Sequence, residues 1–296
     1  MENPKFIDAN GIKTRYFESG SGDPMVLVHG GDFGRPGNAT DWEPVFHSLA
    51  KTFHTYAIDK VGQGYTDNPK SDSEYVIGST VQHLYDFLTA VGEDSAHVVG
   101  HSRGGYTVCR LALEHPEAVK SVVIVDSATL MVPTKEGGGF YADLNAKLAN
   151  IQDPRERMRH GMEAFFFNKQ FVTDARLNAI SEIIKIPKLQ EAAAKLHGGG
   201  HMKGAVASMF AQDLDDRQRE THDWVKAGGL KAPVLLIWGF NDPSAPLDPV
   251  GLNAMRLILP ATPRSQMHVL NQAGHLCFVE QPEDFVGVIT GFIRSS

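Results

Sequence analysis

Residues 98–116 read VVGHSRGGYTVCRLALEHP, and this stretch decides the fold. It begins as an apolar β-strand, breaks at glycines and continues as an amphipathic helix, with Ser102 at the break. The pentapeptide Gly100-His101-Ser102-Arg103-Gly104 matches the pattern G-x-S-x-G between a strand and a helix. A turn this sharp strains the backbone of the serine, and small flanking residues give it room. The stretch therefore predicts a nucleophile elbow with Ser102 as the nucleophile.

A serine hydroxyl attacks well only when a base takes its proton, so a histidine and a carboxylate are expected downstream. Asp242 follows the apolar run VLLIW, and His275 follows the run QMHVL. Ser, Asp and His in this chain order are typical of such an elbow. Asp126, at the end of VVIVD, is a second carboxylate that could reach the imidazole. The sequence favours Asp242 as the acid and leaves a role for Asp126 open.

Short apolar runs alternate with helical patterns along most of the chain. Strands are predicted at residues 25–29, 55–59, 96–100, 121–126, 234–238 and 266–270. Helical patterns lie between them, for example after Ser79, which is a candidate N-cap. This alternation predicts an α/β fold with a mostly parallel sheet, and a ligand site at the carboxyl ends of its strands.

The pattern changes between residues 133 and 226, which read as helices joined by polar loops. Glycine clusters at residues 137–139 and 198–200 suit flexible connections within this segment. The sequence therefore predicts a helical lid at 133–226, inserted into a core made of residues 1–132 and 227–296.

Two backbone N–H groups are expected to stabilise the oxyanion that forms when Ser102 attacks a carbonyl. The N–H of Arg103 starts the helix after the elbow, where negative charge is favoured. The loop VLVHGGDFG is expected to supply the second group. Gly30 and Gly31 let its backbone approach a substrate, and the N–H of Gly31 is the candidate donor.

Composition excludes some classes of partner. A formal net charge of −7 and a pI near 6.0 argue against nucleic acid or an anionic membrane as the main partner. The N-terminus lacks the pattern of a signal peptide, and no apolar run reaches the ~18 residues of a membrane span. We expect a cytoplasmic protein that acts on a small molecule. A homo-oligomer is compatible with the sequence, which leaves the oligomeric state open.

Cysteines and histidines give no sign of a metal centre or a disulfide framework. Cys109 and Cys277 lie far apart in sequence, as expected for free thiols in a reducing compartment. His197 and His201 in HGGGH have i, i+4 spacing, but the intervening glycines disfavour the helix that would aim both at one metal. No metal ion or organic cofactor is predicted.

The motifs together resemble the α/β-hydrolase family. HGG, DxxGxG at residues 59–64, GHSRGG, the Asp242 loop and GH at residues 274–275 carry the resemblance, which spans nearly the whole chain except the lid. The resemblance implies the α/β-hydrolase fold. Family members that dehalogenate or open epoxides have Asp at the elbow, so Ser102 implies acyl transfer through a covalent serine intermediate.

Within the family the chain is similar to hydrolases that split ring-cleavage products of aromatic degradation. The similarity rests on length, the HGG loop and the lid segment FFFNKQFVTDARLNAISE at residues 165–182. The loop HGGDFGRPGNA differs from the group's HGGGPGA; His101 replaces an Asn, and Leu276 replaces a Trp. The group's lid arginine, which binds the dienoate carboxylate, would fall near Ile180, one helical turn from Arg176.

Candidate substrate-binding residues lie in the HGG loop, the elbow and the lid. Arg35, Arg103 and Arg176 are candidates for binding an acidic group. The run 165–167 is triple phenylalanine and could line an apolar pocket, although three adjacent side chains cannot share one helix face. The predicted substrate-binding set is Gly30, Asp32, His101, Phe166, Arg176 and Leu276.

The residues predict a serine hydrolase that cleaves a carboxylic ester or similar small carbonyl compound through an acyl-serine intermediate. The alternative is carbon–carbon bond hydrolysis of an oxo-dienoate ring-cleavage product by the same triad. A hypothesis of another class is a ligand-sensing protein that keeps the fold and signals through movement of the lid.

Overall fold

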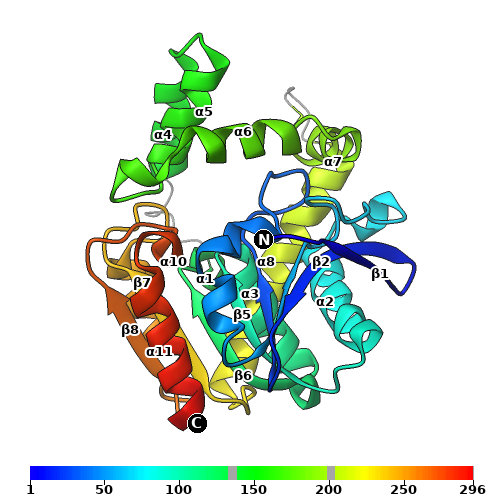
Figure 1. Cartoon of the computed structure of the whole chain (residues 1–296), viewed down its shortest axis with the longest axis vertical. Coiled ribbons are helices and arrows are strands. Elements are labelled where there is room, and N and C mark those ends of the chain that lie inside the picture. The colour runs from blue at the N-terminus through cyan, green and yellow to red at the C-terminus, as the bar shows by residue number, and fades with distance from the viewer. Residues whose placement is uncertain (133–138, 199–203, 296) are drawn as a thin grey trace.

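The computed structural model describes residues 1–132, 139–198 and 204–295. Its centre is one eight-stranded sheet with strand order β1-β2-β4-β3-β5-β6-β7-β8 (Figure 1). Strands β3 to β8 run parallel to one another, whereas β1 and β2 extend the sheet in antiparallel fashion. The predicted fold class, a mostly parallel sheet flanked by helices, is confirmed.

The bounds of the elements are as follows. The strands are β1 (Lys5–Ala9), β2 (Ile12–Ser19), β3 (Pro24–Val28), β4 (His54–Ile58), β5 (Ala96–His101), β6 (Val119–Val125), β7 (Val234–Gly239) and β8 (Gln266–Leu270). The α-helices are α1 (Glu43–Leu49), α2 (Ile77–Val91), α3 (Arg103–Glu114), α4 (Gly139–Ala149), α5 (Pro154–Glu163), α6 (Asp174–Ile183), α7 (Pro187–His197), α8 (Ala205–Lys226), α9 (Leu252–Ile258), α10 (Cys277–Glu280) and α11 (Pro282–Ser295).

The central strands are buried on both faces because their side chains alternate between two cores. In β3, Val26 and Val28 pack with α2, α3 and α9, whereas Met25 and Leu27 pack with α1 and α11 on the other face. The remaining parallel strands repeat this alternation except at the edge strand β8. Burial on both faces explains why these strands read as continuous apolar runs.

An N-terminal hairpin was absent from the predicted strands. Strands β1 and β2 pair in register from Lys5 opposite Tyr16 to Ala9 opposite Ile12. Asn10 and Gly11 form the turn, with φ of 54° and 81°. An Asn-Gly pair suits a tight hairpin because both positions require positive φ.

Helices α4 to α7 lie beyond the carboxyl ends of the strands, in the segment predicted as a lid (Figure 1). Helix α8 starts near them and continues down one face of the sheet. Its C-terminal half packs on α3, where Tyr106 Oη lies 3.0 Å from Thr221 Oγ1, and Val225 belongs to the core. The lid segment therefore ends in a helix that is part of the layer covering the sheet.

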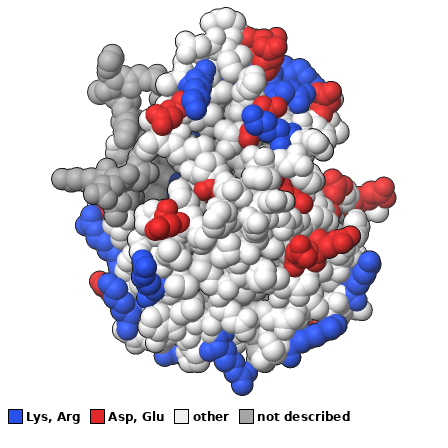
Figure 2. All heavy atoms as spheres, turned by 90° about the vertical axis from the view of Figure 1, so that its left-hand side faces the viewer, with Lys and Arg blue, Asp and Glu red and all other residues white. Residues whose placement is uncertain are grey.

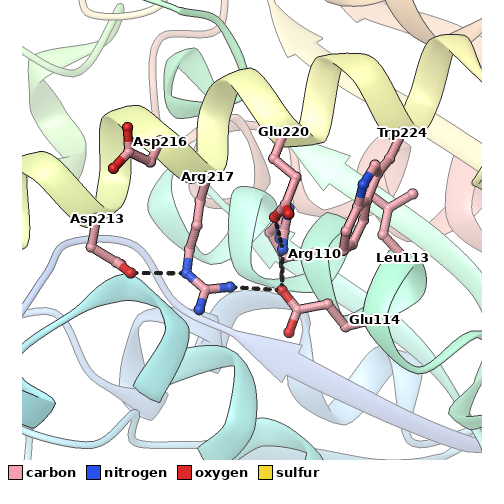
Figure 3. A pocket seen from close by; sticks show the side chains of 8 residues that line it. All are labelled: Arg110, Leu113, Glu114, Asp213, Asp216, Arg217, Glu220 and Trp224. Carbon is pink, nitrogen blue, oxygen red and sulfur yellow. Dashed lines mark hydrogen bonds and ion pairs between the residues drawn. The ribbon is translucent and has the colours of Figure 1, made fainter.

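A surface groove of about 600 Å³ follows the contact between α3 and α8 (Figure 3). Two ion pairs cross it: Arg110 binds Glu220, and Arg217 binds Glu114 at 3.0 Å. Two more lie within a single helix, Arg110 with Glu114 in α3 and Arg217 with Asp213 in α8. The charged side chains satisfy one another, so this groove serves to attach α8 to the core. Ser102, Asp242 and His275 are not among its lining residues.

Acidic and basic side chains are interspersed around a largely uncharged centre on the face that carries β8 and α11 (Figure 2). Cys109 and Cys277 are both buried and free, as predicted. Within the described ranges, no helix combines the length and the apolar character needed to cross a bilayer.

His83 links α2 to the loop after β4 and is held in its neutral form. Its Nδ1 accepts the N–H of Val61 at 3.3 Å, and its Nε2 lies 2.8 Å from Thr14 Oγ1. Burial lowers the pKa of His83 from 6.5 to about 4. Below pH 6.5 the unfolded chain therefore binds a proton that the folded protein takes up only near pH 4.

The free energy of unfolding should fall as the pH drops from 6.5 to 4, with His83 contributing up to about 3 kcal/mol. Urea unfolding at several pH values would measure this slope. His83→Gln should make the slope less steep, although the buried His97, whose pKa is also lowered to about 4, keeps part of it. His268→Gln, at an exposed position, should leave the slope unchanged. Equal slopes in wild type and His83→Gln would contradict the prediction.

Candidate active site

Ser102 occupies the turn between β5 and α3 with φ of 53° and ψ of −121°. Its N–H donates to the carbonyl of Val125 at 2.8 Å, which fixes the turn against β6. A Cβ at Gly100 would collide with the carbonyl oxygen of Gly104, and one at Gly104 would collide with Val28. The glycines of the motif are thus required by close backbone contacts, and the strained turn is the elbow that the sequence predicts.

Asp242 and His275 come together from the loops after β7 and β8. His275 Nδ1 lies 2.6 Å from Asp242 Oδ2. Asp242 Oδ1 accepts hydrogen bonds from Ser244 N, Ser244 Oγ and Ala245 N, so the carboxylate is fixed in orientation. Burial opposes its ionisation, but His275 and these donors lower the pKa of Asp242. With Nδ1–H directed at Asp242, the neutral imidazole carries its lone pair on Nε2 and can act as a base.

Asp126 lies at the end of β6 but has another partner. Its Oδ1 accepts the N–H of Gly239 at 2.8 Å, which ties β6 to the end of β7. Burial and the nearby Asp242 carboxylate raise the pKa of Asp126 well above its usual range. The carboxylate that binds the His275 imidazole is therefore Asp242, whereas burial favours the neutral form of Asp126.

The backbone around His275 is held by the segment that joins α5 to α6. His275 N–H donates to the carbonyl of Phe165 at 2.8 Å. Glu280 bridges the two segments: its Oε2 accepts Gly274 N–H and its Oε1 accepts Asn168 N–H, each at 2.6 Å. We call residues 271–276, between β8 and α10, the histidine loop. Because its carboxylate accepts two charge-assisted hydrogen bonds, Glu280 is a positioning residue for this loop.

Glu280→Gln should lower kcat about tenfold, because an amide can accept one of these N–H groups but presents its own NH₂ to the other. The apparent pKa in the pH profile of kcat/KM should also shift, since His275 would be held less firmly. Glu283→Gln, at an exposed site of α11, is the matched control. A Glu280→Gln protein that only unfolds more easily, with an unchanged pH profile, would reduce Glu280 to a structural role.

The side chains of His29 and Lys60 contact the carbonyl groups of the HGG loop and so fix the direction of the Gly31 N–H. Gly30 carbonyl lies 2.8 Å from His29 Nδ1, and Lys60 Nζ donates to the carbonyl of Gly31 at 2.6 Å. Because the C=O and N–H of a trans peptide point in opposite directions, the N–H of Gly31 faces away from His29. The N–H of Arg103, at the first position of α3, has no partner within its helix. The role of these two N–H groups as oxyanion donors stays a prediction.

Comparison with known proteins adds one family match: the alpha/beta hydrolase fold family matches residues 23–282. The chain belongs to the α/β-hydrolase family. The 2-hydroxy-6-oxo-6-(2'-aminophenyl)hexa-2,4-dienoic acid hydrolase of Metapseudomonas resinovorans is 28% identical over 290 residues, 98% of this chain and 90% of the relative. The 2-hydroxymuconate semialdehyde hydrolase of Pseudomonas sp. strain CF600 is 29% identical over 294 residues, 98% and 93% of the two chains.

Among solved structures, the meta-cleavage product hydrolase from Pseudomonas fluorescens IP01 is similar to this α/β hydrolase with a TM-score of 0.76 and 28% identity. The similarity covers 98% of this chain and 97% of that chain. The resemblance to ring-cleavage hydrolases, drawn from the motifs, is thereby confirmed at the level of sequence and fold.

Several predicted substrate-binding residues of this α/β hydrolase have structural contacts instead. His101 is buried, and its Nε2 lies 2.8 Å from the carbonyl oxygen of His275, so it supports the histidine loop. Gly30 packs against His101 and Ser102, where a side chain would be too close to both. Leu276 begins α10 and packs partly into the core beside α1 and α11.

The two lid residues predicted to contact the substrate, Phe166 and Arg176, pack against other parts of the protein. Phe166 is 6% exposed and packs in the core beside Phe171, so it does not line the site as predicted. Arg176 lies over the Phe166 ring, 5.7 Å from its centroid, and its charge faces Asp41 and Glu43. Arg176 therefore connects the lid segment to the core, which corrects its predicted role as a substrate anchor.

Phe165, one of the three phenylalanines proposed to line an apolar pocket, lies beside His275, and two aromatic residues that the sequence did not single out pack against it. The ring centroid of Phe165 is 5.6 Å from that of His275, 5.3 Å from Phe140 and 6.2 Å from Tyr141. We call Phe140, Tyr141 and Phe165 the aromatic wall. Phe165 rather than Phe166 contributes because adjacent side chains in this short connection point in different directions.

The remaining candidates, Asp32 and Arg103, contact each other next to the elbow. Arg103 Nη2 lies 3.2 Å from Asp32 Oδ2, and His197 Nε2 lies 3.3 Å from Asp32 Oδ1. His197 thus has a carboxylate partner, and His201 lies outside the described residues. In the described part of the chain, no cluster of His, Cys, Asp and Glu has the composition of a metal site.

Proposed function

We propose that this α/β hydrolase cleaves a carbon–carbon bond in an oxo-dienoate of the kind that ring cleavage of aromatic compounds produces. The observation that carries the proposal is similarity over nearly the full chain to hydrolases whose names specify such compounds. The sequence alone favoured ester cleavage, with this reaction as the alternative. The relatives support the alternative more strongly, and the paired His275 and Asp242 suit either reaction.

In the proposed reaction the 2-hydroxydienoate first shifts a proton to give its 2-oxo tautomer. Ser102 Oγ attacks the distal ketone while His275 Nε2 takes its proton, and the N–H groups of Arg103 and Gly31 stabilise the oxyanion. The bond between the ketone carbon and the unsaturated chain breaks. Its electron pair moves into the conjugated 2-oxo system and is then protonated, with His275 as the proton donor.

Water completes the cycle. His275, neutral again, takes a proton from water, and the hydroxide formed attacks the acyl-serine carbonyl. The products are a carboxylic acid from the acyl part and a 2-hydroxydienoate from the leaving part. The ionised Asp242 carboxylate stabilises the imidazolium in both halves of the reaction.

Ester cleavage is the second candidate, because the chain departs from the ring-cleavage group where the dienoate carboxylate is bound. His101 points at the histidine loop, Ile180 stands near the expected lid arginine, and Arg176 faces the core. The same acyl-serine chemistry would then act on an alkoxy or aryloxy leaving group, which leaves as an alcohol after protonation by His275.

The test compares kcat/KM for a 6-phenyl-substituted 2-hydroxy-6-oxo-dienoate with that for a short aryl ester under the same conditions. A higher value for the dienoate is expected, with dienoate and benzoate as products. If the ester is turned over and the dienoate is inert, the proposal fails and the protein is an esterase on this scaffold. Ser102→Ala is the control for non-enzymatic hydrolysis of either compound.

A further inference from the structure

Charged side chains gather around Arg103, the residue that follows Ser102. We call Asp32, Arg35, Arg103 and His197 the charged wall. Asp32 is its only carboxylate, and it already lies close to the other three members, at 3.2 Å from Arg103, 3.3 Å from His197 and 3.8 Å from Arg35. One negative charge therefore faces two arginines, and the wall carries a surplus of positive charge.

The pKa values of Asp32 and Lys60 agree with a surplus of positive charge. Although burial opposes ionisation, His197, Arg103 and Arg35 lower the pKa of Asp32 to about 2. Burial, and next the charge of Arg103, lower the pKa of Lys60, which supports the HGG loop, to about 7. An anion placed against this wall would relieve the repulsion among these cations.

Arg103 is the member with unused binding capacity. Its guanidinium lies over the Phe210 ring, 5.4 Å from the centroid, and one terminal nitrogen, Nη2, is occupied by Asp32. The other terminal nitrogen, Nη1, is buried and has no hydrogen-bond partner among the described residues. Leaving a buried charged donor unpaired is unfavourable, and a carboxylate oxygen is its natural acceptor.

The mechanism decides which part of the substrate meets this wall. The tetrahedral carbon carries Ser102 Oγ, the oxyanion, the acyl chain and the leaving group. His275 must protonate the leaving group, which therefore lies on the side of His275 and the aromatic wall. The acyl chain then extends toward the opposite side. Tyr141 lies near the charges of both sides: burial and Asp242 raise the pKa of its hydroxyl, whereas Ser244, Arg103 and Arg35 lower it.

We infer that the acyl part of the substrate ends in a carboxylate, and that Arg103 Nη1, assisted by Arg35, binds it. The inference rests on the proposed acyl-serine reaction and specifies its substrate as an acidic one whose acyl product is a dicarboxylic acid. Arg103 thus contributes twice, through its backbone N–H to the oxyanion and through its side chain to the choice of acyl group.

A matched pair of dienoates tests the inference. The first is 2-hydroxy-6-oxonona-2,4-diene-1,9-dioate, which releases succinate, and the second is 2-hydroxy-6-oxonona-2,4-dienoate, which releases butanoate. We expect wild type to prefer the dioate in kcat/KM by about 10- to 100-fold, as for one charged hydrogen bond. Arg103→Met should abolish most of this preference, mainly through KM for the dioate, and Arg103→Lys should retain part of it.

For each variant, the measured quantity is the kcat/KM for the dioate divided by the kcat/KM for the monocarboxylate. A general loss of activity, caused by disturbing the Arg103 backbone, lowers both values and cancels in this ratio. Inhibition by succinate and by butanoate gives a second measurement. Arg103→Met should weaken inhibition by succinate and leave inhibition by butanoate unchanged. Arg35→Met, at a largely exposed side chain, should reduce the ratio less and is the variant to use if Arg103→Met fails to fold.

Monoethyl succinate and ethyl butanoate, which carry the same acyl groups, separate this inference from the proposed function. If both dienoates are inert but the esters show the Arg103-dependent preference, carbon–carbon cleavage fails and the acidic acyl site stands. If the dienoates are cleaved with no preference for the dioate, or with a preference that Arg103→Met retains, the inference is wrong and the proposed function stands.

Discussion

Ser102→Ala should lower kcat by about 10⁴- to 10⁶-fold on whichever substrate the enzyme turns over, because no other group can form the acyl intermediate. KM should change little, since the methyl side chain leaves the pocket intact. Rapid-quench measurement with wild type should show a burst of the leaving-group product if acyl-serine hydrolysis is slow, and Ser102→Ala should show none. Mass spectrometry of the quenched wild-type protein should locate the acyl group on Ser102.

Ser121→Ala is the matched control for loss of a buried serine hydroxyl. Ser121 lies on β6, where its Oγ is 2.8 Å from His97 Nδ1, and the mechanism does not use it. Its variant should lose some stability but keep its activity. If Ser102→Ala retained more than a small fraction of wild-type kcat, the acyl-serine mechanism would be wrong.

Asp242→Asn should lower kcat by about 10⁴-fold, because an amide that donates to His275 favours the tautomer with its proton on Nε2. That tautomer cannot accept the proton of Ser102. Asp126→Asn should leave kcat nearly unchanged, since Asp126 Oδ1 accepts from the N–H of Gly239, as an amide oxygen can, and burial favours the neutral form of Asp126.

Comparing the two variants decides between the carboxylates that the sequence left open. The fold of each should be checked by circular dichroism and thermal unfolding before the kinetics are compared. A large loss of kcat in Asp126→Asn, with a small loss in Asp242→Asn, would identify Asp126 as the carboxylate that assists His275. It would contradict the role inferred from the contact between Asp242 and His275.

The sequence predicted the parts of the site that follow directly from strand ends. Ser102, Asp242 and His275 follow the ends of the parallel strands β5, β7 and β8 closely in sequence. Parallel strands bring their carboxyl ends to one edge of the sheet. The N-terminal hairpin was missed although Asn10-Gly11 between alternating residues is a turn signal. Ser79 was read as an N-cap, but α2 begins at Ile77 after Val76.

Contacts between distant segments could not be predicted in the same way. The difference between Phe165 and Phe166 depends on how a short connection lies against the loop after β8, which no periodicity encodes. Glu280 stands five residues after His275 on the next helix, and its role appears only when the amides of Gly274 and Asn168 are seen to converge on it. The charges that act on Arg176, those of Asp41 and Glu43, likewise lie on a segment far away in sequence.

The hydrogen bonds that join Phe165 to His275 and Asn168 to Glu280 limit how freely this enzyme could be recombined with its relatives. A chimaera that receives the helices of another hydrolase would exchange the substrate pocket, but it would also exchange two of the anchors of its own general base. Grafts that retain residues 164–168 from this chain should therefore keep turnover more often than grafts cut at 133 and 226. The inserted helices are in this sense a part of the catalytic core and not an interchangeable module.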